Sequence, residues 1–300
     1  MKEISCIFCN IPGGITVIEE NGYKGKRCTQ CGLIFISPRP SQEEISDLYG
    51  HNNAHITAQE HISDEYRKRL YARHHLRKLN KFVNGGYLLE IGAGAGFFLD
   101  EARKQGFHPY GLEFNPQQAE FMRSTLGIPC EEKPLSVGIF ENKKFDVIYH
   151  CDVISHLYHP VTDFQVMNKL LKEDGILFFE TGNFAEVGES YYSYIPTFMY
   201  PDHLFFFGLD NLKALLEETG FELLYTKRYS ILPQLWLKRK LGNQQGEKNG
   251  THQLQPSGRN NGFMEKAKVY VNYGMRYYAG AISPKQNQPQ TILVCARKKI

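Results

Sequence analysis

The chain has 300 residues, 42% of them hydrophobic, and its 35 Lys and Arg against 32 Asp and Glu give a formal net charge of +3. A chain of this length holds one full domain and a smaller module. Its nearly balanced charge argues against a nucleic-acid-binding surface. No apolar run reaches the roughly 18 residues of a membrane span, and residues 1–10 lack the apolar segment of a secretion signal. We expect a globular, cytoplasmic protein with no membrane partner.

The first forty residues contain two cysteine pairs, Cys6-x-x-Cys9 and Cys28-x-x-Cys31. Two such pairs separated by a short loop let four thiolates converge tetrahedrally on Zn²⁺ at about 2.3 Å. Four thiolates leave no open coordination position, so the metal is expected to be structural. The odd total of 7 cysteines fits a reducing compartment better than a disulfide framework. We predict a zinc-ribbon module over residues 1–40; a redox pair and metal-free thiols are the alternatives.

Residues 41–82 predict an N-terminal helical layer. Ser41 and Glu44 have the spacing of a helix capping box, and residues 64–79 form a charged, amphipathic run. A run of this kind usually presents its polar residues to solvent. We therefore expect a solvated location for the histidines of this layer, which are His51, His55, His61, His74 and His75.

From residue 83 onward, strand and helix signals alternate, which predicts an α/β fold with a parallel sheet covered by helices. The expected strands are 87–92, 108–113, 128–130, 145–151 and 176–182. The helices expected between them are 96–106, 115–127 and 160–175. Each of these helices ends at a glycine, a residue favoured just past a helix C-terminus.

An aromatic-rich segment, residues 191–207, interrupts this alternation. Two interpretations stay open for it: a lid over a substrate, or core beneath a long connection. A helix at 209–220 and strands at 221–229 and 291–298 are expected to complete the fold. The intervening residues 231–290 predict an insertion with two helices around a polar loop.

Three glycines lie between the first expected strand of the sheet and the helix after it, at Gly92, Gly94 and Gly96. Such a loop lets backbone N–H groups approach a polar ligand closely. The dinucleotide fingerprint G-x-G-x-x-G needs its third glycine at position 97, which is Phe97. The pattern that starts at Glu90, E-x-G-x-G-x-G, instead resembles motif I of the class I S-adenosylmethionine-dependent methyltransferases.

The resemblance extends beyond this loop. Glu113 lies about 20 residues further on, where an acidic residue of the family accepts hydrogen bonds from ribose hydroxyls. Residues 145–160 resemble the segment around the fourth strand of the family, although Ile154 and Ser155 stand where relatives often carry Leu-Glu. Residues 291–298 resemble the strand that inserts antiparallel beside the fifth.

The resemblance implies a Rossmann-like seven-stranded sheet with helices on both faces and S-adenosyl-L-methionine as cofactor. A tight turn without a ligand is the alternative for the glycine loop, and a solvated carboxylate for Glu113. The cofactor-binding residues that the resemblance implies are Glu90, Gly92, Ala93, Gly94, Gly96, Glu113, Phe114 and Asp152.

The candidate catalytic residues follow the fifth strand of the sheet, in the sequence Tyr200-Pro201-Asp202-His203. They are expected to face the carboxyl ends of the strands, where open α/β sheets bind their ligands. A zinc ribbon joined to a methyltransferase resembles the sugar C-methyltransferases that act on nucleotide-linked deoxysugars, which carry Tyr-x-Glu-His at this place. Asp202 replaces the family's glutamate.

From this resemblance we expect His203 to be a base or to orient the substrate, Tyr200 to be a hydrogen-bonding partner and Asp202 to contact the substrate. Local packing is the alternative for His203. His156 is a second catalytic candidate. The sugar enzymes also use a tyrosine as a lid, for which the candidates here are Tyr49, Tyr66 and Tyr71.

We therefore expect an enzyme that transfers a methyl group in line from the cofactor to a small hydroxylated metabolite, a nucleotide-linked sugar being favoured. Whether transfer is to carbon, oxygen or nitrogen stays open, as does the oligomeric state. The zinc-containing rRNA guanine methyltransferases are the first alternative, which the modest charge and a second cysteine pair ending in Cys31 instead of histidine disfavour. A cofactor-binding scaffold without catalysis is the second alternative.

The expected organisation has five parts. They are the zinc ribbon at 1–40, the helical layer at 41–82, the cofactor-binding core at 83–185, the aromatic lid or substrate segment at 186–208, and the rest of the fold at 209–300. The insertion at 231–290 belongs to the last part, and the sequence leaves open whether it binds a substrate or a partner.

Overall fold

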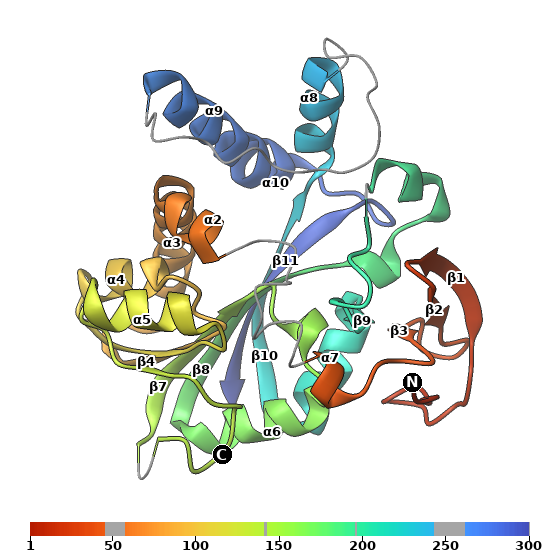
Figure 1. Cartoon of the computed structure of the whole chain (residues 1–300), viewed down its shortest axis with the longest axis horizontal. Coiled ribbons are helices and arrows are strands. Elements are labelled where there is room, and N and C mark those ends of the chain that lie inside the picture. Colours follow the sequence, from red (N-terminus) through yellow and green to blue (C-terminus); the bar gives the residue numbers. More distant parts are fainter. Residues whose placement is uncertain (46–57, 141–142, 196, 243–261, 300) are drawn as a thin grey trace.

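The computed structural model describes residues 1–45, 58–140, 143–195, 197–242 and 262–299. A large twisted sheet carries helices on both faces, and a smaller sheet that includes the N-terminal residues lies beside it (Figure 1). Among the described residues, no helix is both long and apolar enough to cross a membrane.

The large sheet has seven strands. In spatial order they are β10 (Phe221–Ser230), β11 (Gln290–Lys298), β8 (Leu171–Gly182), β7 (Phe145–Cys151), β4 (Gly86–Ile91), β5 (Phe107–Leu112) and β6 (Cys130–Glu131). The five strands from β8 to β6 are parallel, whereas β11 is antiparallel to both of its neighbours. The parallel sheet and the antiparallel final strand expected from the sequence are both confirmed.

Apolar side chains on the two faces of the sheet form two cores. Leu76, Phe98 and Met122 belong to the core on one face, and Phe164 and Leu212 belong to the core on the other. The first face is covered by α3 (Glu65–Leu79), α4 (Phe97–Arg103), α5 (Pro116–Ser124) and α9 (Phe263–Gly274), and the second by α6 (Pro160–Leu170) and α7 (Leu209–Glu218). The strands are therefore buried on both sides, as their continuous apolar sequences require.

The remaining helical elements are short or lie in the connections. They are α2 (Ala58–Ser63), α8 (Leu232–Gly242) and α10 (Gly280–Ile282), the 3₁₀ turns η1 (Ile154–His156), η2 (Phe184–Glu186) and η3 (Glu189–Tyr194), and the π-helical turn η4 (Met275–Ala279). The helices α8, α9 and α10 with η4 belong to the insertion between β10 and β11.

Several helix ends form as the sequence predicts. The Ser41 N–H donates to Glu44 Oε2 at 2.7 Å and the Glu44 N–H to Ser41 Oγ at 3.2 Å, which confirms the capping box. Gly106 and Gly127 follow α4 and α5 with φ of +90° and +63°. The end predicted at Gly175 for the third helix is wrong, because α6 ends at Leu170 and the next residue already pairs with β7.

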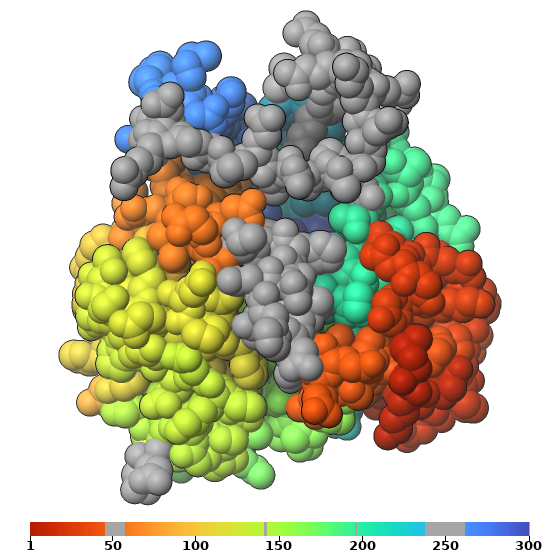
Figure 2. Space-filling model, viewed as in Figure 1, coloured from red at the N-terminus to blue at the C-terminus, as the bar shows by residue number. Residues whose placement is uncertain are grey.

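The small sheet joins the N-terminal module to the aromatic segment. Its strands are β1 (Ile15–Glu20), β2 (Tyr23–Arg27), β3 (Ile34–Ile36) and β9 (Phe205–Phe206), in that spatial order. Tyr200, Phe205 and Phe207 are almost completely buried in the core between this sheet and the large one. Figure 2 shows the module packed against this segment. For these three side chains the core interpretation is supported and the lid interpretation is not.

The solvated location predicted for His74 and His75 is wrong, because both rings are buried under the C-terminal insertion. His75 Nδ1 lies 2.6 Å from the Tyr149 hydroxyl, and its Nε2 lies 3.0 Å from the Tyr277 hydroxyl. His74 lies within 3.2 Å of two tyrosine hydroxyls, those of Tyr229 and Tyr273. His61 is half-buried, and His51 and His55 lie outside the described residues.

A buried ion pair attaches the insertion to the large sheet. Glu180, near the carboxyl end of β8, is fully buried and pairs with Arg276 of η4; its Oε2 also lies 3.1 Å from His75 Nε2. Burial raises the pKa of Glu180, but Arg276 and His75 outweigh it and hold this pKa below its usual value. Glu180 is therefore ionised in the folded protein, and the positive charge of Arg276 balances it.

We expect Glu180→Gln to lower the free energy of unfolding by about 3 kcal/mol at pH 7, because Arg276 keeps a poorly solvated charge without its counterion. The control Glu222→Gln removes an exposed pair with Arg297 at 2.8 Å and should cost less than about 1 kcal/mol. Urea unfolding of both variants and the wild type measures the difference. Equal losses in the two variants would contradict the role assigned to the pair.

The same pair predicts a pH dependence. Because the pKa of Glu180 is lower in the folded than in the unfolded protein, its contribution is present above the usual value of 4.5 and is lost as the pH falls below that value. The stability difference between the wild type and Glu180→Gln should shrink accordingly.

Candidate active site

The glycine loop lies at the carboxyl end of β4, the edge at which open α/β sheets bind ligands. Gly92, Gly94 and Gly96 have φ of +67°, +54° and +78°, a region that side chains disfavour. A Cβ on Gly92 would lie 2.7 Å from Val153 Cγ2, and a Cβ on Gly94 would lie 3.1 Å from Gln118 Oε1. The glycines therefore bring the loop close to the segment after β7 and to α5.

Backbone hydrogen bonds hold the loop against the end of β5. The N–H groups of Gly92 and Ala93 donate to the Leu112 carbonyl at 2.9 and 3.1 Å. The Gly96 N–H donates to the Ala93 carbonyl at 3.0 Å, at the start of α4. This arrangement shapes the loop before any ligand is bound.

Glu113 follows β5 and reaches over the glycine loop. Its Oε2 accepts from the Gly94 N–H at 2.7 Å and its Oε1 from the Asn115 N–H at 2.8 Å. Burial raises the pKa of this carboxyl above its usual value, although both N–H groups act in the opposite direction. Each oxygen has a further lone pair for a ligand hydroxyl.

Glu90 is the last but one residue of β4 and is only 6% exposed. Its Oε2 is buried without a hydrogen-bond partner among the described residues. Burial raises the pKa of Glu90 well above its usual value, and the charge of Glu113 acts in the same direction. A buried acceptor without a partner is rare in native proteins, so this oxygen fits a ligand that carries a cationic N–H donor.

Lys68 is a residue of this site that the sequence analysis missed. It lies on α3, and its ammonium makes no hydrogen bond or ion pair with the described residues. Burial raises the pKa of Glu90, Glu113 and Asp152, and the positive charge of Lys68 opposes this rise at all three. The charged run of α3 contained no signal to single out this lysine, because only the packing of α3 against the sheet turns it toward the carboxylates.

His61 was expected on a solvated face and instead lies close to the glycine loop. Its Nδ1 is 3.8 Å from the position that a Cβ on Gly94 would occupy. Burial lowers the pKa of His61 to about 4, and the charges of Lys68 and Arg67 add to this effect. The ring is therefore neutral at pH 7.

The two remaining candidates for cofactor binding lie at the surface of this edge. The Phe114 side chain, next to Glu113, is half exposed. Asp152 follows β7 with a φ of +55°, and its N–H donates to the Glu180 carbonyl at 2.9 Å. A non-glycine residue in this conformation is strained, and such residues cluster at functional sites.

His156, Asp202 and His203 come together from two distant segments. The His156 Nδ1–H donates to Asp202 Oδ1 at 3.0 Å, and the rings of His156 and His203 have centroids 4.6 Å apart. The Leu204 N–H donates to the Ser155 carbonyl at 2.7 Å, which fixes the two segments side by side. Three of the four predicted catalytic residues are thus neighbours.

Tyr200 does not join them. Its side chain is 1% exposed and packs under β2, close to Gly25. Its hydroxyl has no hydrogen-bond partner among the described residues, and burial raises its pKa. This position argues against the hydrogen-bonding role that the sequence motif implied, because a side chain in the core cannot contact His203 and a substrate together.

The pKa of His156 reflects its contact with Asp202. Burial by itself lowers this pKa, but the hydrogen bond and the negative charge of Asp202 outweigh it and raise the pKa above its ordinary value. His156 therefore stays protonated to a higher pH than an isolated histidine.

We expect Asp202→Asn to lower the pKa of His156, so that the ring loses its proton at a lower pH than in the wild type. Nuclear magnetic resonance titration of ¹⁵N-labelled histidine measures this pKa directly. Asp210→Asn, which removes an exposed partner of Lys213, is the matched control and should leave the titration unchanged. The same curve for all three proteins would contradict the pairing.

The four N-terminal cysteines form a second candidate site, a metal centre. The Sγ atoms of Cys6, Cys9, Cys28 and Cys31 all lie within 4.8 Å of one another, and those of Cys6 and Cys31 are 3.5 Å apart. Tetrahedral Zn²⁺ at about 2.3 Å from each sulfur requires separations of about 3.8 Å, so the donor set and its geometry fit this metal.

The backbone around Cys28 favours its thiolate, whereas burial raises the pKa of Cys6 and of Cys31. Burial raises the pKa of Cys28, but the N–H groups of Cys31 and Gln30 outweigh it and lower the pKa to about 7. The Asn211 side chain donates to the Cys31 carbonyl at 2.9 Å, which attaches the cysteine cluster to α7.

A family model described as a methyltransferase domain matches residues 63–226, more than half of the chain. This range includes the glycine loop, Glu113, and the segments that carry His156 and His203.

Curated relatives match the same region. A ubiquinone biosynthesis O-methyltransferase of Actinobacillus pleuropneumoniae is 27% identical over 109 residues, which are 33% of this chain and 47% of the relative. A tRNA U34 carboxymethyltransferase of Helicobacter hepaticus is 25% identical over 112 residues, 33% of this chain and 36% of the relative. The matches thus span about half or less of these relatives.

Solved structures share the fold over a larger part of the chain. The phosphoethanolamine N-methyltransferase 2 of Haemonchus contortus, in complex with S-adenosyl-L-methionine, superposes with a TM-score of 0.52 and 14% identity, over 89% of this chain and 62% of that one. At this identity the likeness concerns the fold alone. With the strand order of the sheet and the family match, it leads to one conclusion: the chain belongs to the methyltransferase domain family and has the class I fold.

Proposed function

We propose that this protein is an S-adenosylmethionine-dependent methyltransferase that methylates a small hydroxylated metabolite. The observation that carries the proposal is the set of charges at the glycine loop. The carboxyl groups of the buried Glu90 and the half-buried Glu113 lie at the carboxyl edge of the sheet, and the cation of Lys68 acts on both. They complement a nucleoside with a zwitterionic amino-acid tail better than a pyrophosphate, because the ammonium group and the ribose hydroxyls of such a ligand can donate to the oxygens of Glu90 and Glu113, whereas a pyrophosphate carries only acceptors.

Each part of the cofactor has a complementary group in this chain. The orphaned oxygen of Glu90 is suited to the α-ammonium group, and Lys68 to the carboxylate. Glu113 has lone pairs for the ribose hydroxyls, and the exposed ring of Phe114 offers a surface for the adenine. The bound cofactor supplies an electrophilic methyl group on its sulfonium.

The acceptor side of the proposed site consists of His156, Asp202 and His203. His203 is the proposed base or substrate-orienting group, since methyl transfer to a hydroxyl or a carbon acid requires removal of a proton. Asp202 is engaged by His156, so we assign it a positioning role instead of the substrate contact expected from the motif. The charge of Asp152, which follows β7, also raises the pKa of His156.

The acceptor is proposed at the level of a chemical class. The relatives named ubiquinone biosynthesis O-methyltransferase favour a hydroxyl oxygen as the methylated atom. A nucleotide-linked sugar has only the support of the Tyr-x-Asp-His motif and of the cysteine module. A nucleic-acid acceptor, suggested by the relative that modifies tRNA, is disfavoured by a net charge of +3.

We further propose that the four cysteines hold a structural Zn²⁺. Four thiolates around one ion leave no position for a substrate, so the metal stabilises the module and does no chemistry. A small module of three short strands has little core of its own, which is the usual reason for a metal in such a unit.

Calorimetric titration with S-adenosylhomocysteine tests the cofactor site. We expect micromolar binding by the wild type and loss of binding in Gly94→Asp, because the new side chain meets Gln118 and adds negative charge beside Glu113. Gly138→Asp, at an exposed position with open space around it, is the control and should bind normally. Binding of NAD in place of S-adenosylhomocysteine, or full binding by Gly94→Asp, would refute the assignment.

Turnover distinguishes an enzyme from a scaffold that only binds the cofactor. The protein is supplied with S-adenosylmethionine and panels of phenols, nucleotide sugars and RNA, and release of S-adenosylhomocysteine is measured. Release with a hydroxylated small molecule supports the proposal. Release with RNA alone would replace the acceptor class, and no release with any panel would favour the scaffold.

Metal analysis tests the zinc proposal. We expect about one equivalent of zinc in protein purified without chelator, and a large loss of zinc together with a lower melting temperature in Cys28→Ser, since three remaining thiolates bind the ion less tightly. Cys130→Ser, which changes a cysteine of β6 outside the cluster, should keep its zinc. Wild-type protein with less than half an equivalent would contradict the proposal.

A further inference from the structure

The turn between β1 and β2 reaches across to the segment that precedes His203. Glu20 Oε1 accepts from the Thr197 hydroxyl and the Phe198 N–H, both at 2.9 Å, and its Oε2 accepts from the Tyr200 N–H at 2.9 Å. The Asn21 side chain donates to the Tyr200 carbonyl at 2.8 Å. Two adjacent residues of the cysteine module therefore bind four groups of residues 197–200.

The residue between these bonds is strained. Met199 has a φ of +63°, a left-handed conformation that disfavours residues with a side chain. The N–H groups on both sides of it donate to Glu20, and the Met199 carbonyl accepts from the His203 N–H at 3.1 Å. The turn that presents Asp202 and His203 thus starts from a backbone conformation that Glu20 holds.

The same segment is held again just beyond His203. The Ile36 N–H of β3 donates to the Leu204 carbonyl at 3.0 Å, while the Leu204 N–H donates to Ser155, next to His156, at 2.7 Å. Residues 197–204 therefore lie between the cysteine module on one side and the segment that carries His156 on the other. Movement of the module would change the relative position of the two histidines.

Within the described residues, the module makes no comparable hydrogen bond to the cofactor side. Among the described residues, no hydrogen bond joins residues 1–40 to Glu90 or to residues 92–96. The hydrogen bonds from the module to the rest of the chain instead reach Tyr158 and several residues between 185 and 211, Tyr200 among them.

We propose that Glu20 and Asn21 are positioning residues that set the geometry of Asp202 and His203 against His156, so that the cysteine module acts on the acceptor side of the site and not on the cofactor side. The proposal rests on the proposed function for the role of the histidines. Its structural part, control of their geometry by the module, can be measured without a known acceptor.

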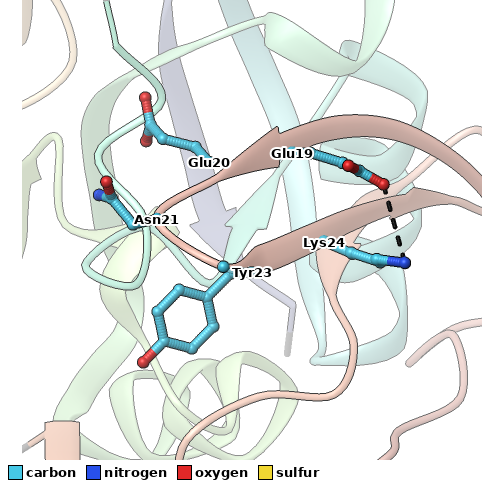
Figure 3. Close-up of a pocket in the computed structure, with 6 residues that line it drawn as sticks. Glu19, Glu20, Asn21, Tyr23 and Lys24 are labelled. Carbon is cyan, nitrogen blue, oxygen red and sulfur yellow. Dashed lines mark ion pairs between the residues drawn. The ribbon is translucent and has the colours of Figure 1, made fainter.

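A neighbouring glutamate provides the matched control. Figure 3 shows Glu20 and Asn21 on one side of the hairpin and Glu19 with Lys24 on the other. Glu19 is exposed, and its carboxylate lies 3.8 Å from the Lys24 ammonium. Glu20→Gln keeps the size of the side chain but places an amide NH₂ opposite a backbone N–H, whereas Glu19→Gln removes only a weak surface pair.

The experiment measures two quantities on full-length, zinc-loaded protein. Histidine ring resonances of His156 and His203, assigned with His→Asn variants, report the acceptor side, and calorimetric affinity for S-adenosylhomocysteine reports the cofactor side. For Glu20→Gln we expect shifted resonances and altered titration of both rings, with the affinity unchanged within about twofold. Glu19→Gln should match the wild type in both measurements.

Asn21→Gly is the second variant, used in case Glu20→Gln does not fold. Asn21 has a φ of +53°, which glycine adopts without strain, so this change removes only the hydrogen bond to Tyr200. We expect smaller shifts of the same resonances. Unchanged resonances of His203 and His156 in both folded variants would overturn the proposal. A loss of affinity for S-adenosylhomocysteine beyond about twofold would overturn it too, because the module would then act on the cofactor side as well.

Once an acceptor is known, the two variants give a kinetic test. We expect Glu20→Gln to lower kcat by about 10- to 100-fold, the size of effect that misplacement by about 1 Å produces, while KM for the cofactor stays unchanged. A change in KM for the cofactor with an unchanged kcat would overturn the proposal. If the wild type fails to bind S-adenosylhomocysteine, the proposed function fails, but the resonances still decide whether the module controls the histidines.

Discussion

The parallel pairing of β5, β4, β7 and β8 is the constraint on which the site depends. Parallel strands end at the same edge of the sheet, so Glu113, Glu90, Asp152 and Glu180 are brought together although they are far apart in sequence. The sheet is covered on both faces, and this edge is the one at which open α/β sheets bind their ligands. The glycine loop then allows the backbone to approach the same edge closely.

Carboxylates that lie close together at one edge of the sheet need positive charges or hydrogen-bond donors beside them to stay ionised. Glu180 has such partners within the protein, Arg276 and His75, and is therefore ionised. Glu90 differs, because its buried Oε2 has no hydrogen-bond partner among the described residues, and Lys68 of α3 acts on it only through its charge. One carboxylate is thus satisfied by the fold and serves stability, whereas the other is suited to a cationic ligand. This difference between two glutamates on the same face of the sheet is the physical basis of the proposed cofactor site.

Two additions to the core act on different parts of this edge. The C-terminal insertion contributes Arg276 and buries His74 and His75, and so attaches itself to β8. The cysteine module pairs its strand β3 with β9 and reaches residues 197–200 through Glu20. The first stabilises the sheet beneath the site, and the second borders the segment that carries His203. A metal in the cysteine cluster would stabilise the module from which these contacts are made.

The sequence by itself determined the order of strands and helices, the glycine loop and the grouping of the cysteines. These features depend on local patterns: apolar runs for buried strands, glycine where φ is positive, and Cys-x-x-Cys pairs that converge within a short loop. Glu113 could also be predicted, because it directly follows the strand next to the loop. Only the tertiary structure decided which polar residues of α3 face the core, since a charged helix looks the same whether or not an insertion 190 residues later covers it. For the same reason the sequence did not separate Tyr200, which is buried under β2, from His203 three residues later, which lies beside His156: the contact partners of both come from distant parts of the chain.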